Sequence, residues 1–329
     1  MAAQRRAENT PAAVAMIDTS TPHPARRYNY WLGGKDHFAA DRESGDAIAA
    51  VFPHVREAAL QNRWFLQRAV AYLAGQAGIR QFLDVGVGIP LSPNTHEIAQ
   101  DFAPDCRVVY VDNDPIVLTH ARALLTSDPA GATAYVEADL RDPAAILDDP
   151  GVHHTIDLSQ PVGLLLVAVL HFLDDDEATR AVAELRAALA PGSYIVLSHG
   201  TTDYVSVETA ARIPALQQDN EVRFQPRSRE QVAGFVAGLY AVDPAPPAPG
   251  TVAPLVPIDR SGPQLVSVVR WRPDRSAHDL PRDEDVACYG VVAGMPDGAT
   301  RPAGAMPAAS PVASTDVTSR DANHEPGRG

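Results

Sequence analysis

Three short apolar segments, each ending in a carboxylate, constrain the fold of this chain more than any other feature. The first, residues 81–85, contains Asp84 and leads directly into a Gly-x-Gly turn. The second and third, residues 108–112 and 134–139, end at Asp112 and Asp139. Because helix-sized segments separate them, we expect neighbouring strands of a parallel sheet, with the acids at its carboxyl edge. Nucleosides bind at such an edge, so the ordered acids predict a nucleoside-binding site.

The turn after the first segment distinguishes two kinds of nucleoside ligand. Gly86 and Gly88 allow positive φ angles and a close approach of the backbone to a ligand. A dinucleotide site would add a third small residue and free N–H groups for a pyrophosphate. Here Leu91 stands in place of the small residue, and Pro90 has no N–H to donate. We therefore predict S-adenosylmethionine as the cofactor and methyl transfer as the reaction.

Two of the acids have separate expected contacts with this cofactor. Asp112 ends its strand where a carboxylate can accept hydrogen bonds from both ribose hydroxyls. Asp139 and the backbone of Leu140 end the next strand, where they are expected to meet the adenine edge.

Composition and charge exclude several other classes of function. The 27 basic and 41 acidic residues give a net charge of −14, which disfavours nucleic acid as a partner. No apolar run is long enough to span a bilayer, so we expect no membrane segment. Cys106 and Cys288 have no partner in CxxC spacing, which predicts a reducing cytoplasm and no metal site.

The chain divides into four expected parts. Residues 1–17 and 296–329 lack the large apolar residues of a core and are predicted to be disordered tails. Residues 18–78 are predicted to form an amino-terminal lid and helical cap, with a specific loop over 18–40 and a helical pattern over 41–75. Residues 79–295 are predicted to form the cofactor-binding domain.

Within that domain the apolar runs predict further strands and helices. The continuous run 162–170 indicates a central strand buried on both faces, and 193–197 and 240–242 follow as strands. Residues 265–271 and 287–292 are expected at a closing antiparallel edge, and 244–257 as a proline-rich surface loop. Helices are expected over 94–102, 116–125, 144–147, 175–189 and 229–239.

His171 is the candidate catalytic residue because it directly follows the predicted strand 162–170. An imidazole there is suited to remove a proton from a methyl acceptor, although it could instead only line the pocket. His199, at the end of strand 193–197, is expected on the substrate side, and His23 and His37 in the lid. The neighbouring His153 and His154 are expected to be solvated.

Two basic residues have both a functional and an ordinary interpretation. Lys35 is the only lysine beside 26 arginines, so it is either a selected ammonium group or a chance surface residue. Arg63, next to Asn62 in the helical pattern, could bind the cofactor carboxylate or could lie on an ordinary helix surface.

Several segments together carry a family resemblance. They are residues 23–30, 32–36, 41–43, 62–63, 82–90, 110–115, 170–172 and 191–194. In these segments the chain resembles the actinobacterial S-adenosylmethionine-dependent methyltransferase family that was formerly catalogued as a domain of unknown function. The resemblance implies an α/β class I Rossmann-like methyltransferase fold, with a seven-stranded, mostly parallel sheet and an amino-terminal helical cap.

The resemblance also implies roles for individual residues. Gly86 and Gly88 would pack against the cofactor, and the loop with Gly34 and Lys35 would fold over its methionine end. The position of His171 is similar to that of the histidine after the fourth strand in small-molecule O-methyltransferases. The remaining expected cofactor contacts are Arg63, Asp84, Pro90, Asp112, Asn113, Asp139, Leu140 and Val169.

The predicted function is methylation of an oxygen or nitrogen of a small-molecule metabolite. One alternative is a protein that binds S-adenosylmethionine or S-adenosylhomocysteine as a sensor or partner, without catalysis. Another is an NAD-dependent oxidoreductase, which Pro90 and Leu91 disfavour. The methyl acceptor and the oligomeric state stay open.

Overall fold

The structure is a computed structural model that describes residues 18–124, 126–220, 224–245, 255–258, 262, 264–274 and 277–296. The two segments predicted to be disordered tails, 1–17 and 296–329, therefore lie outside the described residues, apart from Pro296. None of the described helices combines the length and the hydrophobicity of a membrane-spanning segment.

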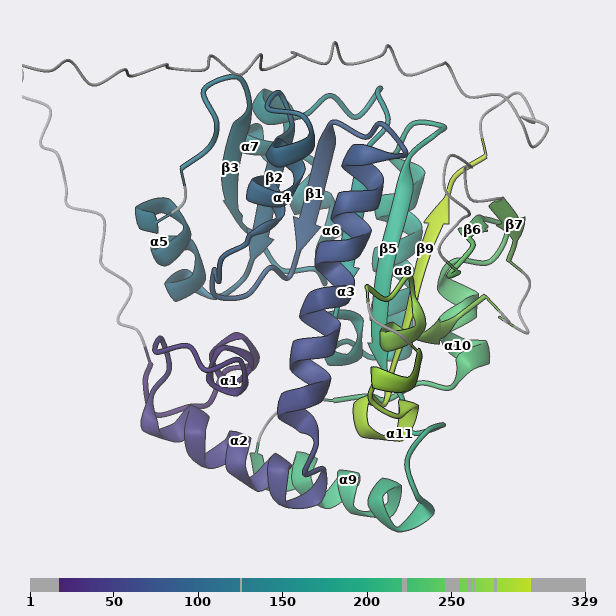
Figure 1. The fold of residues 1–329 in the computed structure, drawn as a ribbon. Coiled ribbons are helices and arrows are strands. Elements are labelled where there is room, and N and C mark those ends of the chain that lie inside the picture. The colour runs from purple at the N-terminus through teal and green to yellow at the C-terminus, as the bar shows by residue number, and fades with distance from the viewer. Residues whose placement is uncertain are drawn as a thin grey trace, which may run out of the picture.

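A nine-stranded sheet forms the centre of the molecule (Figure 1). Its order is β3-β2-β1-β4-β5-β9-β6-β7, and β8 pairs with β9. Strands β1 to β5 are parallel to one another, whereas β9 runs antiparallel between β5 and β6. The strands are β1 (Gln81–Val85), β2 (Arg107–Asp112), β3 (Ala132–Glu137), β4 (Gly163–Val167), β5 (Tyr194–Gly200), β6 (Tyr240–Val242), β7 (Leu255–Pro257), β8 (Val266–Ser267) and β9 (Cys288–Gly294).

The α/β class and the mostly parallel sheet are confirmed, but the predicted count of seven strands is wrong. Strands β7 and β8 are only three and two residues long, and β8 lies within the segment 265–271 that was expected at the antiparallel edge. β7 forms inside the segment expected to be a loop, because β6 offers its free edge there. β9 was expected at an edge but lies inside the sheet, which agrees with the complete burial of its seven residues.

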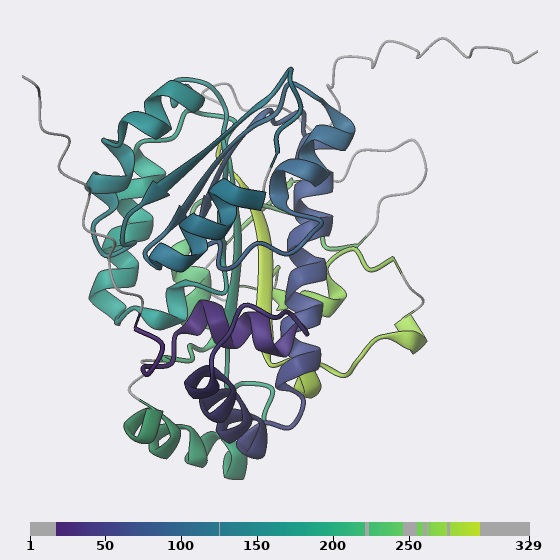
Figure 2. The same ribbon diagram turned by 90° about the vertical axis from the view of Figure 1, so that its left-hand side faces the viewer.

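Helices cover both faces of the sheet, which Figure 2 shows nearly edge-on. The helices are α1 (Pro24–Trp31), α2 (Ala39–Val51), α3 (Val55–Gly75), α4 (Thr95–Phe102), α5 (Pro115–Leu124), α6 (Pro143–Leu147), α7 (Pro150–Thr155), α8 (Asp175–Ala187), α9 (Val207–Asn220), α10 (Arg229–Phe235) and α11 (Asp283–Val286). Short 3₁₀ turns occupy Leu170–Phe172, Val268–Arg270 and Ala277–Asp279.

Alternation of side chains along the strands divides the core between the two faces. Phe82 of β1 packs in the cluster beneath α3 and α4, while the next residue, Leu83, packs in the cluster beneath α8 and α10. The same alternation separates Val108 from Val109 in β2.

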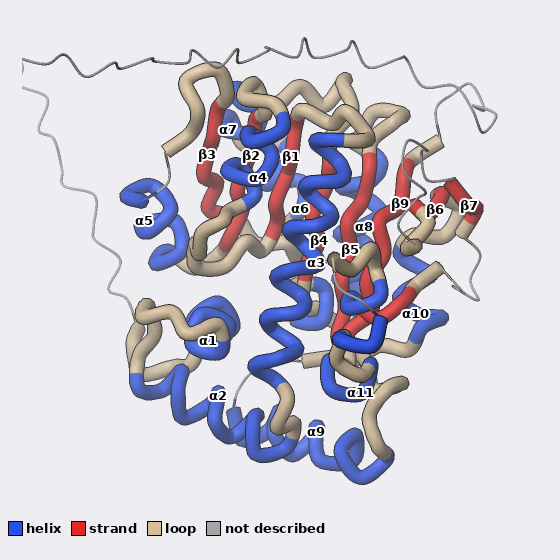
Figure 3. Tube along the Cα trace, viewed as in Figure 1, coloured by secondary structure: helices blue, strands red, loops and turns tan. Residues whose placement is uncertain are grey.

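Helices α1, α2 and α9 lie beyond the carboxyl ends of the parallel strands (Figures 1 and 3). The segment 18–40 was expected to be a loop, but it contains α1. The helical pattern over 41–75 forms two helices, because Phe52-Pro53-His54 interrupts it and proline cannot donate a helical hydrogen bond. Helix α9 lies along α2, where the Arg212 guanidinium donates to the Ala50 carbonyl oxygen.

Candidate functional site

The turn after β1 is joined to the acid at the end of β2. The Gly88 N–H donates to Asp112 Oδ2 at 2.8 Å, and the Asp114 N–H donates to Asp112 Oδ1 at 2.9 Å. Asp112 is 6% exposed, and burial raises its pKa to about 6. Two backbone donors therefore fix the carboxylate while leaving each oxygen a further lone pair for a ligand hydroxyl.

The first three N–H groups of the same turn are already used within the protein. Those of Gly86 and Val87 both donate to the Val111 carbonyl oxygen, and that of Gly88 donates to Asp112. A phosphate-binding turn instead points successive free N–H groups at the anion. This observation supports the prediction, made from Pro90 and Leu91, that the turn does not bind a dinucleotide.

Both glycines of the turn adopt positive φ angles, of 75° at Gly86 and 68° at Gly88. A Cβ atom on Gly86 would lie 2.5 Å from Val169 Cγ2, so the side chain of Val169 sits directly against this glycine. The nearest atom to a Cβ on Gly88 would be the Ala25 Cβ of α1, at 3.9 Å. The turn thus contacts the end of β4 on one side and the cap on the other.

The chain has an unusual conformation just before Val169. Ala168 has a φ of 55°, in the region that a residue with a side chain rarely adopts. Its N–H donates to Ser198 Oγ at 2.9 Å, which ties the end of β4 to β5. Such conformations cluster at functional sites, where the surrounding structure holds them.

Asp84 is buried behind the turn and bonds within the protein. Thr95 Oγ1 donates to Asp84 Oδ2 at 2.6 Å, and burial raises the pKa of Asp84 to about 6. Arg63 lies near this carboxyl group, but its guanidinium donates to the carbonyl oxygens of Leu91 and Pro93. In this structure Arg63 therefore holds the loop after the turn, and its binding of a cofactor carboxylate stays a prediction.

Asp139 and Asn113 meet at the ends of β3 and β2. Asn113 Nδ2 donates to Asp139 Oδ2 at 3.1 Å, and the Arg141 guanidinium approaches the same oxygen at 2.9 Å. Burial would raise the pKa of Asp139, but hydrogen bonds from the Arg141 backbone and from Asn113 outweigh it and lower that pKa. The adjacent Leu140 is buried in the core, so only its backbone is suited to face a ligand.

The cap is attached to the sheet beside Asp112. His23 Nδ1 lies 3.1 Å from Asp114 Oδ2, and Arg26 Nε lies 3.6 Å from the same oxygen. Asp41, which is completely buried, accepts from the N–H groups of His23 and Phe38. These contacts connect His23 to Asp41 and Asp114, two buried acids that the sequence analysis did not single out.

The predicted loop with Gly34 and Lys35 contacts the rest of the protein through the residues beside it in the sequence. A Cβ on Gly34 would lie 2.3 Å from the Asn29 side chain, so a glycine is needed for this contact. Asp36 Oδ1 lies 3.2 Å from His120 Nε2 on α5, which connects the loop to the helix that follows β2. Lys35 itself is exposed, and its role at the methionine end of the cofactor stays a prediction.

His171 and His199 lie together at the ends of β4 and β5. Their ring centroids are 5.5 Å apart, and the rings of Phe172 and Phe224 lie 4.4 and 4.9 Å from His171. Burial, together with the nearby His199 and Arg227, lowers the pKa of His171 well below its usual value. His171 is therefore a neutral imidazole in an aromatic setting at neutral pH.

Arg227 organises this part of the site, and sequence reasoning missed it. Its side chain is 1% exposed and reaches Asp175 Oδ1 at 2.8 Å and His199 Nε2 at 2.9 Å. It also donates to the carbonyl oxygens of Leu170 and Leu173 on either side of His171. The polar stretch 225–230 contains both Arg227 and Arg229, and nothing in the sequence signals that Arg227 will be the buried one.

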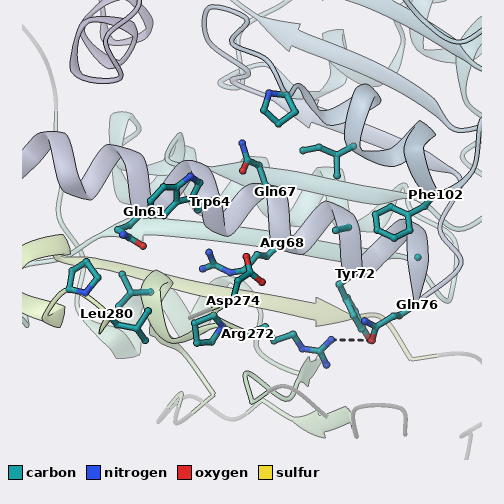
Figure 4. A pocket seen from close by; sticks show the side chains of 17 residues that line it. Gln61, Trp64, Gln67, Arg68, Tyr72, Gln76, Phe102, Arg272, Asp274 and Leu280 are labelled. Atoms are coloured by element: carbon teal, nitrogen blue, oxygen red, sulfur yellow. Dashed lines mark hydrogen bonds between the residues drawn. The ribbon is translucent and has the colours of Figure 1, made fainter. Parts of the chain in front are cut away.

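A separate groove of about 610 Å³ runs along α3 (Figure 4). None of the predicted site residues lines it. The two arginines that line the groove form hydrogen bonds within the protein. Arg68 donates to the carbonyl oxygens of Trp271 and Val268. Arg272 donates to the Asp243 carbonyl oxygen and to the Gln76 side chain. No group of acids, histidines and cysteines suited to a metal ion occurs among the described residues.

The carboxyl edge suits S-adenosylmethionine. The buried Asp84, Asp112 and Asp114 give it negative charge, which favours a ligand with a sulfonium and an ammonium group. Asp112 has lone pairs for hydroxyl groups, and the first N–H groups of the turn are not free for a phosphate. Four of the predicted cofactor residues lie close together at this edge: Gly86, Gly88, Asp112 and Val169. Beside them, Asn113 and Asp139 form a hydrogen-bonded pair. Pro90 lies in the same turn, half-buried.

Comparison with known proteins gives matches over most of the chain. A family profile described as S-adenosyl methyltransferase matches residues 10–248. A DUF574 family protein from Streptomyces avermitilis is 45% identical, with a TM-score of 0.76, and the match covers 85% of this chain and 100% of that one. A candidate methyltransferase from Thermobifida fusca is 38% identical, with a TM-score of 0.73 and coverage of 85% and 97%. No curated protein matches the chain.

Proposed function

Since the chain belongs to the S-adenosyl methyltransferase family, we propose that it methylates an oxygen or nitrogen of a small-molecule metabolite bound beside His171. The chain is an S-adenosylmethionine-dependent methyltransferase with a class I fold, and its predicted actinobacterial family is confirmed. The proposal concerns the acceptor and the residues that bind it.

When bound, S-adenosylmethionine supplies a methyl group on a positively charged sulfur. The protein's contribution to such a displacement is alignment and exclusion of water. We assign Asp112 to the ribose hydroxyls, Asn113, Asp139 and the Leu140 backbone to the adenine, and Gly86, Gly88 and Pro90 to close backbone approach. Val169 would then pack at the reacting end, because it joins the turn to the strand that precedes His171.

The observation that carries the acceptor assignment is the buried histidine pair at the ends of β4 and β5. His171 and His199 lie at the same sheet edge as Asp112, and α1, α2 and α9 lie across that edge. A site covered by helices in this way favours a small acceptor over a polymer. The net charge of −14 also disfavours nucleic acid.

The cellular location is part of the proposal. Cys106 and Cys288 are both buried and unpaired, which fits the reducing cytoplasm predicted from their spacing.

Calorimetric titration with S-adenosylmethionine, S-adenosylhomocysteine and NAD tests the cofactor site. Both sulfur ligands should bind and NAD should not. Asp112→Ala should weaken binding by about ten- to a hundred-fold, since it removes hydrogen bonds to a charged group. The control Asp176→Ala removes an exposed carboxylate on α8 and should leave the affinity unchanged.

Binding of NAD, or an affinity that does not respond to Asp112→Ala, would contradict the assigned site. A panel of small hydroxyl, carboxyl and amino compounds then tests the acceptor, with formation of S-adenosylhomocysteine as the readout. Tight cofactor binding with no turnover on any acceptor would favour the sensor alternative instead.

A further inference from the structure

A chain of hydrogen bonds runs from solvent-facing Asp175 to the ring of His171. Asp175 accepts from Arg227 Nε at 2.8 Å, and Arg227 Nη1 lies 2.9 Å from His199 Nε2. His199 Nδ1 lies 2.7 Å from the Gly200 carbonyl oxygen. The Gly200 N–H in turn points at His171 Nδ1, 3.4 Å away.

The direction of each bond in this chain follows from its chemistry. A guanidinium can only donate, so His199 Nε2 must accept from Arg227. A carbonyl oxygen can only accept, so His199 Nδ1 must carry the proton that it donates to Gly200. His199 is thereby held as the neutral Nδ1–H tautomer, which agrees with its pKa of about 4, lowered by burial.

His171 is held in the opposite tautomer. The Gly200 N–H can only donate, so His171 Nδ1 must accept, and the proton of the neutral ring then lies on Nε2. No hydrogen-bond partner of Nε2 is present among the described residues. The ring therefore offers a donor, and no lone pair, at its free nitrogen.

We propose that His171 meets the methyl acceptor as a hydrogen-bond donor through Nε2–H, and that the acceptor is an oxygen anion, either a carboxylate or an acidic phenol. This inference rests on the proposed methyl transfer and deepens it by naming the acceptor class. A general base at this position would need a free lone pair on Nε2, which the Gly200 N–H opposite Nδ1 disfavours.

The charges around His171 favour the same class of acceptor. Arg227 is 1% exposed, whereas its carboxylate partner, Asp175, is 56% exposed and screened by water. The charged and titratable groups that face His171 are Arg227 and His199, and both disfavour a positive charge on the ring. A buried cation whose carboxylate partner is largely in water stabilises an anion nearby.

An oxygen anion also needs no base. It forms the new O–C bond with its own lone pair, and the electron pair of the broken C–S bond stays on sulfur. The transfer therefore neutralises two opposite charges and releases no proton. Within this arrangement His171 contacts the acceptor, whereas Arg227 and His199 are positioning residues that act through it.

The decisive experiment observes the His171 tautomer directly. Long-range ¹H–¹⁵N correlation spectra of the full chain with ¹⁵N-labelled histidine distinguish the two neutral tautomers and the protonated ring. His171→Gln identifies the His171 signal, and the exposed His153 and His154 provide the reference for a solvated imidazole. We expect the Nε2–H tautomer throughout pH 5.5–8.5. An Nδ1–H tautomer, or protonation near the ordinary value of about 6.5, would overturn the inference.

Variants of Arg227 test its positioning role. Arg227→Met should raise the pKa of His171, because Arg227 opposes a positive charge on the ring, and should mix the His199 tautomers, which Arg227 holds by donating to Nε2. Arg227→Lys keeps the charge and should retain much of the native spectrum. This variant replaces Arg227→Met in the test if the methionine variant does not fold. Arg56→Met removes an exposed arginine and should leave both signals unchanged. Identical spectra for Arg227→Met and the wild type would contradict the proposed role.

The acceptor class is tested with matched probes in the presence of S-adenosylhomocysteine. Benzoate should shift the His171 Nε2–H signal, whereas benzyl alcohol should not. No response to benzoate, or a response to the alcohol alone, would refute the anionic class. Calorimetric binding of S-adenosylhomocysteine reports on the proposed function separately. If S-adenosylhomocysteine binds but His171 has the Nδ1–H tautomer, this inference is refuted and the proposed function is not.

Discussion

Gly86 provides the sharpest test of how the turn is built. Substituting Gly86→Ala places a Cβ at a φ of 75°, which costs roughly 1–2 kcal/mol for an L-residue. The same Cβ would lie 2.5 Å from Val169 Cγ2, and relief of such overlap costs about 1–3 kcal/mol more. We therefore expect the free energy of unfolding to fall by about 2–5 kcal/mol.

A matched control separates the two contributions. Gly78 has nearly the same φ, 74°, but a Cβ there would meet no atom within 4 Å. Gly78→Ala should therefore lose only the backbone contribution of about 1–2 kcal/mol. Urea denaturation of both variants measures the difference, which should be at least about 1 kcal/mol.

The double variant Gly86→Ala/Val169→Ala, compared with the two single variants, forms a double-mutant cycle that measures the coupling between these positions. Removal of the valine methyl groups should recover part of the loss, although the Val169 Cβ, at 2.9 Å, still crowds the site. A coupling of about 1 kcal/mol or more between the two positions is expected. If Gly86→Ala costs no more than Gly78→Ala, or if the two changes simply add, then Val169 does not pack against this turn and its assignment to the cofactor site fails.

Three further predictions concern the buried charges. Arg227→Ala should lower the free energy of unfolding by about 3–5 kcal/mol, whereas Arg56→Ala, at an exposed ion pair, should cost about 1 kcal/mol or less in the same urea titration. Asp41→Asn should speed amide hydrogen exchange in α1 more than in α8, because Asp41 accepts backbone bonds that hold the cap; equal changes in both helices would contradict this. The native pKa of Asp112 is about 6, above its unfolded value, so the native carboxyl gains its proton first as pH falls. The stability of the wild type relative to Asp112→Asn should therefore rise by about 1 kcal/mol from pH 7 to pH 5, and a constant or falling difference would refute the burial argument.

The strand-end acids were predictable because each depends on a local pattern. An apolar run that ends in an acid fixes both the strand and the edge at which the side chain lies, so Asp84, Asp112 and Asp139 could be placed at one edge of the sheet. The turn glycines were predictable for the same reason, since a strand that leads into a tight turn needs positive φ angles there.

Contacts between distant segments were not predictable. Helix α1 has no apolar period in its sequence, and it is held by contacts such as Tyr28 with Asn62 and Arg27 with Ser44. Arg227 is buried because carbonyl oxygens 57 and 54 residues earlier in the chain, at Leu170 and Leu173, converge on it. Arg63 Nη2 donates to the carbonyl oxygens of Leu91 and Pro93, contacts that the sequence does not indicate, and its predicted contact with the cofactor carboxylate stays a prediction.

The short segment after β2 joins the cofactor turn to the cap. Asp112 accepts from Gly88 in the turn, and Asp114, two residues later, faces His23 and Arg26 in the cap. The Asp114 N–H also donates to Asp112, so the two acids are parts of one bonded unit. A Cβ atom on Gly88 would lie 3.9 Å from the Ala25 Cβ, so α1 borders the face of Gly88 that we propose for the cofactor. A cofactor bound as proposed would therefore lie against both the turn and α1, and the bonded pair Asp112 and Asp114 would connect its site to the cap.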